Sequence, residues 1–182
     1  MQVQETEIPG VLLLTPKRFG DHRGFFSETY NGKLFEQAGV HLQFVQDNQS
    51  LSVEKGVLRG LHYQLEPKAQ DKLVRVIRGS ILDIAVDIRR GSPTFGKHVA
   101  AVISQENWQQ ILVPKGFAHG FVTLEPNTEV VYKVTDYYSP EHERGICWND
   151  PELGIDWTID PSEMILSDRD KKHPRFSEAD LG

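Results

Sequence analysis

Short apolar runs, each bounded by Gly, Pro, Asn or Asp, recur along the whole chain and limit it to folds built from many short strands. The run from Ile81 to Asp87 shows the clearest alternation of apolar and polar side chains, and it follows a turn signal at Gly79 and Ser80. Such spacing predicts an all-β sandwich or barrel. Strands are expected at Phe25–Tyr30, Leu42–Gln46, Val57–His62, Lys72–Ile77, Ile81–Asp87, His98–Ile103, Gln109–Val113, His119–Leu124 and Glu129–Thr135.

Helical signals are few by comparison. Asn31 is a good N-cap for a short helix that carries Leu34 and Phe35 and stops at Gly39. A second helix is expected to open at Ser167, with acidic residues in its first turn. The loop-rich stretch from Trp148 onward is expected to wrap the barrel rather than form a domain.

Length and composition indicate one globular unit spanning residues 1–182, because 182 residues with 38% hydrophobic content can bury one sizeable core. The net charge of -6 and the lack of a basic run argue against a nucleic-acid partner, although a few arginines in one cleft could still bind a small anion. The first residues predict neither a signal peptide nor a membrane span. Cys147 is the only cysteine, so no intramolecular disulfide is expected and a cytoplasmic location is predicted.

The segment from Gly56 to His62 combines a phosphate-binding cation, Arg59, with a titratable base, His62. Strict alternation along a strand would place these two side chains on opposite faces. Gly60 between them is a natural place for a bulge, which could re-aim both side chains into one cavity. The other possibility is that Arg59 reaches its ligand around the rim of the barrel.

A second histidine ends the spacing Pro114-x-Gly116-x-x-His119, which together with the run ending at His62 resembles the two motifs of the cupin superfamily, a jelly roll. A metal-binding cupin would have a further histidine at position 64 and a glutamate at 68 or 69. This chain has Gln64, Lys68 and Ala69 at those positions. We therefore expect no catalytic metal and no cofactor.

Without a metal, the expected reaction is one that side chains catalyse by transferring protons. A histidine can act as a base near neutrality, a tyrosine can return a proton as an acid, and a lysine can stabilise an oxyanion. Together these groups would suit proton abstraction next to a carbonyl. The titratable candidates are His62, Lys72, Asp83, His119, Tyr132 and Asp170.

Many ordered blocks of the sequence resemble the dTDP-4-dehydrorhamnose 3,5-epimerase family, and they cover nearly the whole chain. The blocks begin at Phe19, Val45, Leu58, Ala69, Ser92, Pro114, Tyr137 and Trp148. The resemblance implies a mainly β, cupin-type jelly roll (a double-stranded β-helix barrel) and a cofactor-independent isomerase. It implies epimerisation of dTDP-4-dehydro-6-deoxy-D-glucose at C3 and C5 to dTDP-4-dehydro-L-rhamnose, in dTDP-L-rhamnose biosynthesis.

The resemblance also implies four catalytic residues. His62 would abstract the proton, Asp170 would hold the imidazole in its working tautomer, and Tyr132 would return a proton from the opposite face. Lys72 would stabilise the developing oxygen anion at C4. Asp83, a carboxylate inside an apolar strand, has to be paired there, and His62 and Lys72 are the candidate partners. It is therefore the alternative group for orienting His62.

Substrate-binding roles follow from the same resemblance. Arg23, Arg59 and Arg169 would contact the diphosphate, because a guanidinium matches phosphate oxygens. Tyr138 would stack on thymine, and His119 would hydrogen-bond the sugar or its phosphate. The nucleotide or sugar would contact Glu28, Gln46, Asn48 and Glu143. Family members are commonly homodimers, in which Arg23 and Glu28 would reach the neighbouring subunit's pocket.

Three alternatives remain open from the sequence. The protein could instead epimerise a single centre, or isomerise the ketone, as relatives with the same base and nucleotide site do, although Tyr132 favours epimerisation at both centres. A metal-dependent cupin oxygenase or isomerase is disfavoured by Gln64. A non-catalytic nucleotide-sugar binding module would have no need of a base, an acid and a lysine together.

Overall fold

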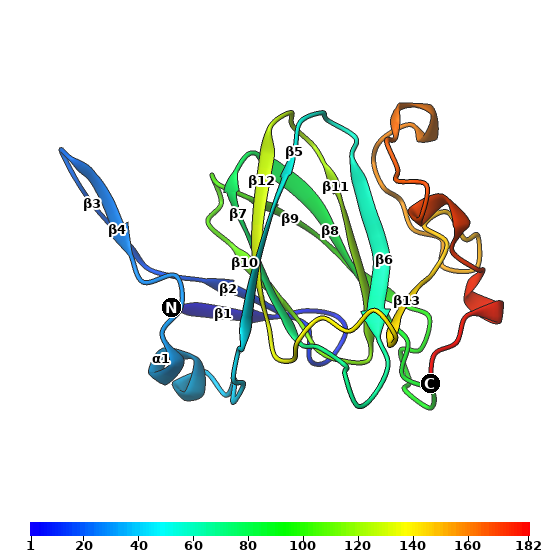
Figure 1. Cartoon of the computed structure of the whole chain (residues 1–182). Coiled ribbons are helices and arrows are strands. Elements are labelled where there is room, and N and C mark those ends of the chain that lie inside the picture. Colours follow the sequence, from blue (N-terminus) through cyan, green and yellow to red (C-terminus); the bar gives the residue numbers. More distant parts are fainter.

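Two antiparallel sheets face each other in the computed structural model, which describes all residues 1–182 (Figure 1). The six-stranded sheet has the order β1 (Gln2–Glu5), β2 (Leu12–Thr15), β10 (Gln110–Val113), β7 (Lys72–Arg78), β12 (Thr128–Val134) and β5 (Gln46–Ser52). The five-stranded sheet has the order β13 (Glu143–Gly145), β6 (Leu58–Gln64), β11 (Phe117–Thr123), β8 (Ser80–Asp87) and β9 (His98–Ser104). This arrangement confirms the predicted all-β jelly roll.

Most of the predicted strands are present with boundaries that differ by at most two residues. They correspond to β6, β7, β8, β9, β10, β11 and β12. The predicted strand Phe25–Tyr30 overlaps β4 (Gly24–Ser27) only in its first half, because the chain leaves the β3–β4 ribbon after Ser27. β3 spans Arg18–Asp21 and, like β1, β2 and β13, has no counterpart among the predicted strands.

The predicted strand at Leu42–Gln46 is wrong, because strand β5 begins at Gln46 and continues to Ser52. Leu42 and Phe44 are instead packed against the apolar cluster beneath the helix, which explains their alternation without a strand. The sequence QDNQSLS of β5 is too polar to be recognised as a strand. Every residue of β5 nevertheless pairs with β12, from Gln46 opposite Val134 to Ser52 opposite Thr128.

Three apolar clusters hold the layers together. The central cluster lies between the sheets and includes Val74, Ile111 and Phe121. A second cluster covers the outer face of the five-stranded sheet, where the C-terminal segment contributes Trp157 and Phe176. β8 is therefore buried at every position, since both of its faces are covered. The prediction that the C-terminal stretch wraps the barrel is confirmed (Figure 1).

The helices are short, as predicted. Helix α1 (Gly32–Gln37) begins after Asn31, whose side chain accepts a hydrogen bond from the Leu34 backbone N–H. The helix predicted to open at Ser167 is wrong, because the chain forms only a 3₁₀ turn, η2 (Asp170–Lys172). Pro174 follows so closely that a longer helix cannot continue. The other two 3₁₀ turns are η1 (Pro161–Glu163) and η3 (Phe176–Glu178).

The ribbon of β3 and β4 projects away from the body of the molecule as an arm (Figure 1). Phe19, Phe25 and Phe26 on this arm are 54%, 59% and 66% exposed. None of the helices has the length and apolar composition needed to span a membrane.

Candidate active site

A bulge in β6 brings Arg59 and His62 to the same cavity. Arg59 is paired with Phe121 and His62 with His119, so three residue steps along β6 correspond to two along β11. The extra residue restores a common face for the two side chains, as expected of a bulge. Gly60 has φ +132° at this point, and a Cβ there would lie 2.6 Å from the Gly120 Cα. Arg59 therefore does not reach around the rim of the barrel. Instead, Gly60 distorts the strand so that Arg59 and His62 share one cavity.

The cavity lies between the two sheets and has a volume of about 280 Å³. It brings together most of the predicted site residues: Arg59, His62, Lys72, His119, Tyr132, Arg169 and Asp170. Its wall also contains Ser50, Phe121 and Ser167, which sequence reasoning missed. A smaller adjoining cavity shares His62, Lys72 and Tyr132 with it and adds the predicted Gln46, Asn48, Tyr138 and Glu143.

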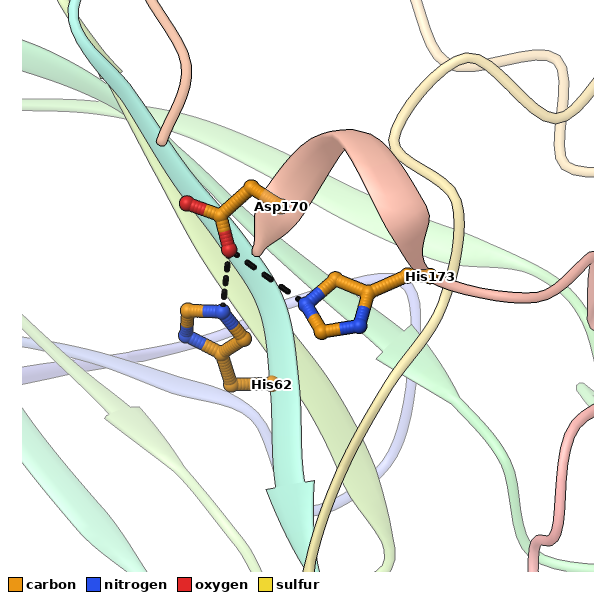
Figure 2. A group of neighbouring side chains, drawn as sticks. All are labelled: His62, Asp170 and His173. Carbon is orange, nitrogen blue, oxygen red and sulfur yellow. Dashed lines mark hydrogen bonds and ion pairs between the residues drawn. The ribbon is translucent and has the colours of Figure 1, made fainter. Parts of the chain in front are cut away.

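His62 forms a hydrogen-bonded pair with Asp170, which reaches it from turn η2 (Figure 2). The distance from His62 Nε2 to Asp170 Oδ1 is 2.6 Å, and Asp170 is buried. Ser167 Oγ donates to the other carboxylate oxygen at 2.9 Å. An ionised carboxylate only accepts, so Nε2 carries the proton and Nδ1 is free to accept one. Asp170, and not Asp83, is therefore the partner of His62.

Both members of this pair have perturbed pKa values. Burial lowers the pKa of His62 because it disfavours the imidazolium, although the hydrogen bond that His62 donates to Asp170 opposes the shift. Burial on its own would raise the pKa of Asp170, but the neighbouring imidazoles of His173 and His62 and the Ser167 hydroxyl outweigh it and lower that pKa. At neutral pH the pair is thus a neutral imidazole beside a carboxylate, which is the state a general base needs.

Asp83 is paired with His119 instead of His62 or Lys72. His119 Nε2 lies 2.9 Å from each Asp83 carboxylate oxygen, and both side chains are buried. The contact comes from adjacent strands, since β8 and β11 pair with each other and Asp83 lies opposite Phe121. One ring nitrogen of His119 is committed to this contact, so any contact with a ligand in the cavity falls to the rest of the ring.

Lys72 and Tyr132 enter the cavity from the six-stranded sheet, opposite His62. Burial lowers the pKa of Lys72 to about 8, although Glu143 and Asp83 act in the other direction. The Lys72 ammonium forms no ion pair within the chain and is free to meet an anionic oxygen. Burial raises the pKa of Tyr132, which keeps its hydroxyl protonated as a general acid requires.

The adjoining cavity is organised around Glu143. Its carboxylate accepts a hydrogen bond from the Tyr138 hydroxyl at 2.6 Å and pairs with Arg169 at 2.5 Å. Gln46 connects strand β5 to this group, because its side-chain oxygen accepts from the Tyr138 backbone N–H at 3.1 Å. Gln46 also donates to the Asn48 side chain at 2.9 Å. These polar groups lie beside the His62 cavity and are suited to a polar ligand.

Two predicted residues, Arg23 and Glu28, are not in the cavity of their own chain. Arg23 lies on the β3–β4 arm and forms an exposed ion pair with Asp21. Glu28 accepts a hydrogen bond from the Asn31 side chain at 3.2 Å. The distance between the arm and the barrel is evident in Figure 1.

Gln64, which stands where a metal-binding cupin has a histidine, is used to hold a loop. Its side-chain NH₂ donates to the Lys68 carbonyl at 2.6 Å and to the Tyr137 carbonyl at 3.2 Å. Its side-chain oxygen accepts from the Ser139 backbone N–H at 2.8 Å. All three hydrogen bonds that this side chain makes are therefore directed at neighbouring backbone.

The missed residues had no usable signal in the sequence, because β5 is too polar to be recognised as a strand and its alternation is visible only in the folded chain. Ser50 lies on β5, where the inward positions Gln46, Asn48, Ser50 and Ser52 alternate with exposed ones. A strand with a polar inward face must face a cavity rather than an apolar core. Ser167 and Phe121 carry no such pattern, and only the folded chain brings them to the site.

Known proteins resemble this chain over nearly its whole length. The sequence matches the dTDP-4-dehydrorhamnose 3,5-epimerase family over residues 5–178. A dTDP-4-dehydrorhamnose 3,5-epimerase from Shigella flexneri is 54% identical over 181 residues, which cover 99% of this chain and 98% of the relative. Its counterpart from Pseudomonas aeruginosa is 52% identical over 181 residues, with the same coverage of 99% and 98%.

Solved structures give the same result. A dTDP-6-deoxy-D-glucose-3,5-epimerase from Legionella pneumophila, solved in complex with dTDP-4-keto-L-rhamnose, matches with a TM-score of 0.94 and 46% identity, covering 98% of this chain and 94% of that one. A 3'-monoepimerase from Streptomyces bikiniensis, in complex with dTDP-quinovose, matches with a TM-score of 0.88 and 35% identity, covering 94% and 86%. By sequence and by structure, this chain belongs to the dTDP-4-dehydrorhamnose 3,5-epimerase family.

Proposed function

We propose that this protein epimerises dTDP-4-dehydro-6-deoxy-D-glucose at C3 and C5 to give dTDP-4-dehydro-L-rhamnose. The observation that carries the proposal is the placement of a neutral histidine base and a protonated tyrosine on opposing sheets of one cavity, with an unpaired lysine beside them. Inversion of a centre requires a proton to leave from one face and another to arrive from the opposite face. Both carbons flank the C4 ketone, so one set of groups can serve each centre in turn.

In the proposed reaction, His62 Nδ1 takes the proton from C3 or C5 while Asp170 holds Nε2–H and stabilises the imidazolium that forms. The electron pair of the broken C–H bond moves into the enolate, whose negative oxygen at C4 is stabilised by the Lys72 ammonium. Tyr132 then delivers its proton to the other face of the same carbon. His62 then releases its proton to solvent and Tyr132 takes one up from solvent, so each cycle leaves the substrate isomerised and the enzyme restored, with no change in oxidation state.

Binding of the nucleotide diphosphate is proposed for the arginines that meet at the cavity. Arg59 is anchored by hydrogen bonds to Ser52 Oγ and the Leu51 carbonyl, both at 3.3 Å, and keeps donors free for a phosphate. Arg169 lies on the same cavity and is tied to Glu143. Tyr138 is half exposed beside them and could stack on the base, with Gln46, Asn48 and Glu143 contacting the nucleotide or sugar.

We further propose that the active form is a cytoplasmic homodimer in which each chain, from residue 1 to 182, is one catalytic unit. The exposed phenylalanines of the projecting arm support this proposal, because monomeric proteins rarely expose contiguous apolar surface of this kind. In a dimer the arm could bring Arg23 and Glu28 to the partner's cavity and add a third guanidinium to the phosphate site.

The test is incubation of the protein with dTDP-4-dehydro-6-deoxy-D-glucose in ²H₂O, followed by mass spectrometry and NMR. Deuterium at both C3 and C5 with inversion supports the proposal. Deuterium at only one carbon would select a single-centre epimerase, the activity named for the Streptomyces relative. Binding without exchange at either carbon would point to a nucleotide-sugar binding module and contradict the proposal.

A further inference from the structure

A further histidine, His173, lies beside the catalytic pair, and its buried Nε2 atom has no hydrogen bond. His173 follows turn η2, and its side chain is only 9% exposed. Its ring packs against Gly145 so closely that a Cβ on that glycine would lie 2.3 Å from the ring. The Nε2 atom lies 3.3 Å from Asp170 Oδ1, but it is left without a hydrogen bond. The ion-pairing partner of this nitrogen is the Asp170 carboxylate, which His62 and Ser167 also engage, so the nitrogen has no hydrogen bond of its own.

The orphaned nitrogen belongs to a group of three potential metal ligands. His62 Nε2, Asp170 Oδ1 and His173 Nε2 all lie within 4.8 Å of one another. Figure 2 shows both imidazoles pointing at the same carboxylate oxygen, and their ring centroids are 5.4 Å apart. Two imidazoles and one carboxylate form a ligand set that suits Zn²⁺, with the fourth tetrahedral position left for water.

The geometry has to adjust to hold an ion, because the three ligand atoms lie within 4.8 Å of one another and not yet at the spacing of a bound metal. Ligands of a tetrahedral Zn²⁺ stand about 3.3 Å apart, given metal–ligand distances of roughly 2.0–2.1 Å. His173 Nε2 is already 3.3 Å from Asp170 Oδ1, whereas His62 Nε2 is 2.6 Å from it and would have to move back. Ser167 donates to the other oxygen of Asp170 and fixes the carboxylate from behind, as supporting groups of metal sites do. His62 and Asp170 line the substrate cavity, which gives the ion its route of entry.

We propose that His62, Asp170 and His173 form an inhibitory binding site for Zn²⁺, which shares His62 with the metal site of metal-dependent cupins but takes its other two ligands from the C-terminal segment. The ion replaces the proton on His62 Nε2, and the neutral ring then carries its proton on Nδ1. Nδ1 is the nitrogen that accepts the substrate proton, so the metal-bound enzyme has no base. This last step rests on the proposed function, whereas binding of the ion does not.

Binding is tested by isothermal titration of the chelator-treated, full-length protein with ZnCl₂. The wild type should bind one Zn²⁺ at this site. His173→Ala should weaken binding at least about tenfold, because losing even a group that only hydrogen-bonds to a metal ligand commonly weakens binding that much. His41→Ala, which removes an exposed histidine, is the matched control and should bind as the wild type does. Thermal unfolding of each variant establishes that it is folded. Absence of binding in the wild type, or equal binding by His173→Ala, would overturn the site.

Inhibition is tested by comparing the rates of deuterium exchange at C3 and C5 of the substrate with and without Zn²⁺. Zn²⁺ should suppress deuterium exchange in the wild type, EDTA should restore it, and His173→Ala should resist the same Zn²⁺ concentration. If exchange is absent from the wild type even without metal, the proposed function fails while the binding result still decides the site. If Zn²⁺ binds through His173 and exchange continues unchanged, the inhibitory role is wrong.

Discussion

At the scale of single residues, the chemistry depends on a base that stays neutral and a cation that stays charged. Burial lowers the pKa of both His62 and Lys72, but the two groups are in different protonation states near neutral pH. A lower pKa keeps the imidazole ready to accept a proton near neutrality. The lysine, at about 8, remains mostly protonated there and can stabilise an oxyanion.

The first prediction concerns Asp170. We expect Asp170→Asn to lower kcat by roughly 10²–10⁴-fold, because the amide no longer fixes the tautomer or stabilises the imidazolium. Removing the carboxylate also removes the interaction that raises the pKa of His62, so the acid limb of the rate profile should move to lower pH. Steady-state kinetics from pH 5 to 9 checks both effects. An unchanged kcat would show that Asp170 does not act on the base.

The second prediction concerns the alkaline limb. The value of kcat/KM should fall as pH rises through about 8, because the free enzyme then loses the Lys72 proton. Lys72→Arg should remove this limb, since a guanidinium stays protonated throughout the range. Its KM and kcat are expected to be poorer, but the shape of the profile is the relevant readout. A limb that stays at the same pH in Lys72→Arg would assign it to another group.

At the scale of elements, the site is built by a bulge and by two segments with weak sequence signals. The bulge at Gly60 gives β6 the extra residue that turns Arg59 and His62 to one face. Strand β5 lines the cavity with polar side chains, and turn η2 supplies Asp170 from the C-terminal segment. The apolar strands mainly form the frame that these three features require.

The third prediction tests the bulge. Gly60→Ala should lower the free energy of unfolding by about 1–3 kcal/mol, because the added Cβ would meet the Gly120 backbone at 2.6 Å. Gly24→Ala is the matched control, since Gly24 has φ +129° but no atom within 4 Å of its Cβ position. Urea unfolding of both variants separates the close approach from the backbone conformation. An equal decrease in the free energy of unfolding of the two variants would mean that the contact with Gly120 does not destabilise Gly60→Ala.

Sequence patterns could predict the frame but only part of the site. The strands containing His62, Lys72, His119 and Tyr132 were recognisable because apolar residues flank these positions. Asp170 could be matched to His62 only through family resemblance, because 108 residues separate the pair and a short turn carries the carboxylate. The partner of Asp83 followed from the register of β8 and β11, which single-strand periodicity does not encode.

At the scale of the whole molecule, the exposed β3–β4 arm is the feature that the structure of a single chain does not explain. Phe26 is 66% exposed at its surface, whereas Phe25 packs edge-on against Trp108 at a centroid distance of 4.9 Å. The proposed dimer would bury these rings and bring Arg23 to a phosphate. Assembly and substrate affinity should therefore change together.

The fourth prediction is that Phe26→Ser weakens self-association at least about tenfold, since buried aromatic anchors commonly contribute more than that to an interface. The variant should also raise KM, because Arg23 would no longer reach the neighbouring cavity. Val102→Ser on β9, where the valine is 47% exposed, is the control for loss of surface apolarity. Sedimentation velocity across a range of concentrations measures the change. A wild type that sediments as a monomer would contradict the dimer.

The central claim is that His62 and Tyr132 act on opposite faces of the same carbon, and the most direct measurement separates proton exchange from inversion. Each variant is incubated with dTDP-4-dehydro-6-deoxy-D-glucose in ²H₂O, and NMR follows deuterium and configuration at C3 and C5 together. His62→Asn should abolish exchange at both carbons, whereas Tyr132→Phe should retain exchange with little inversion. Normal exchange in His62→Asn, or normal inversion in Tyr132→Phe, would contradict the account.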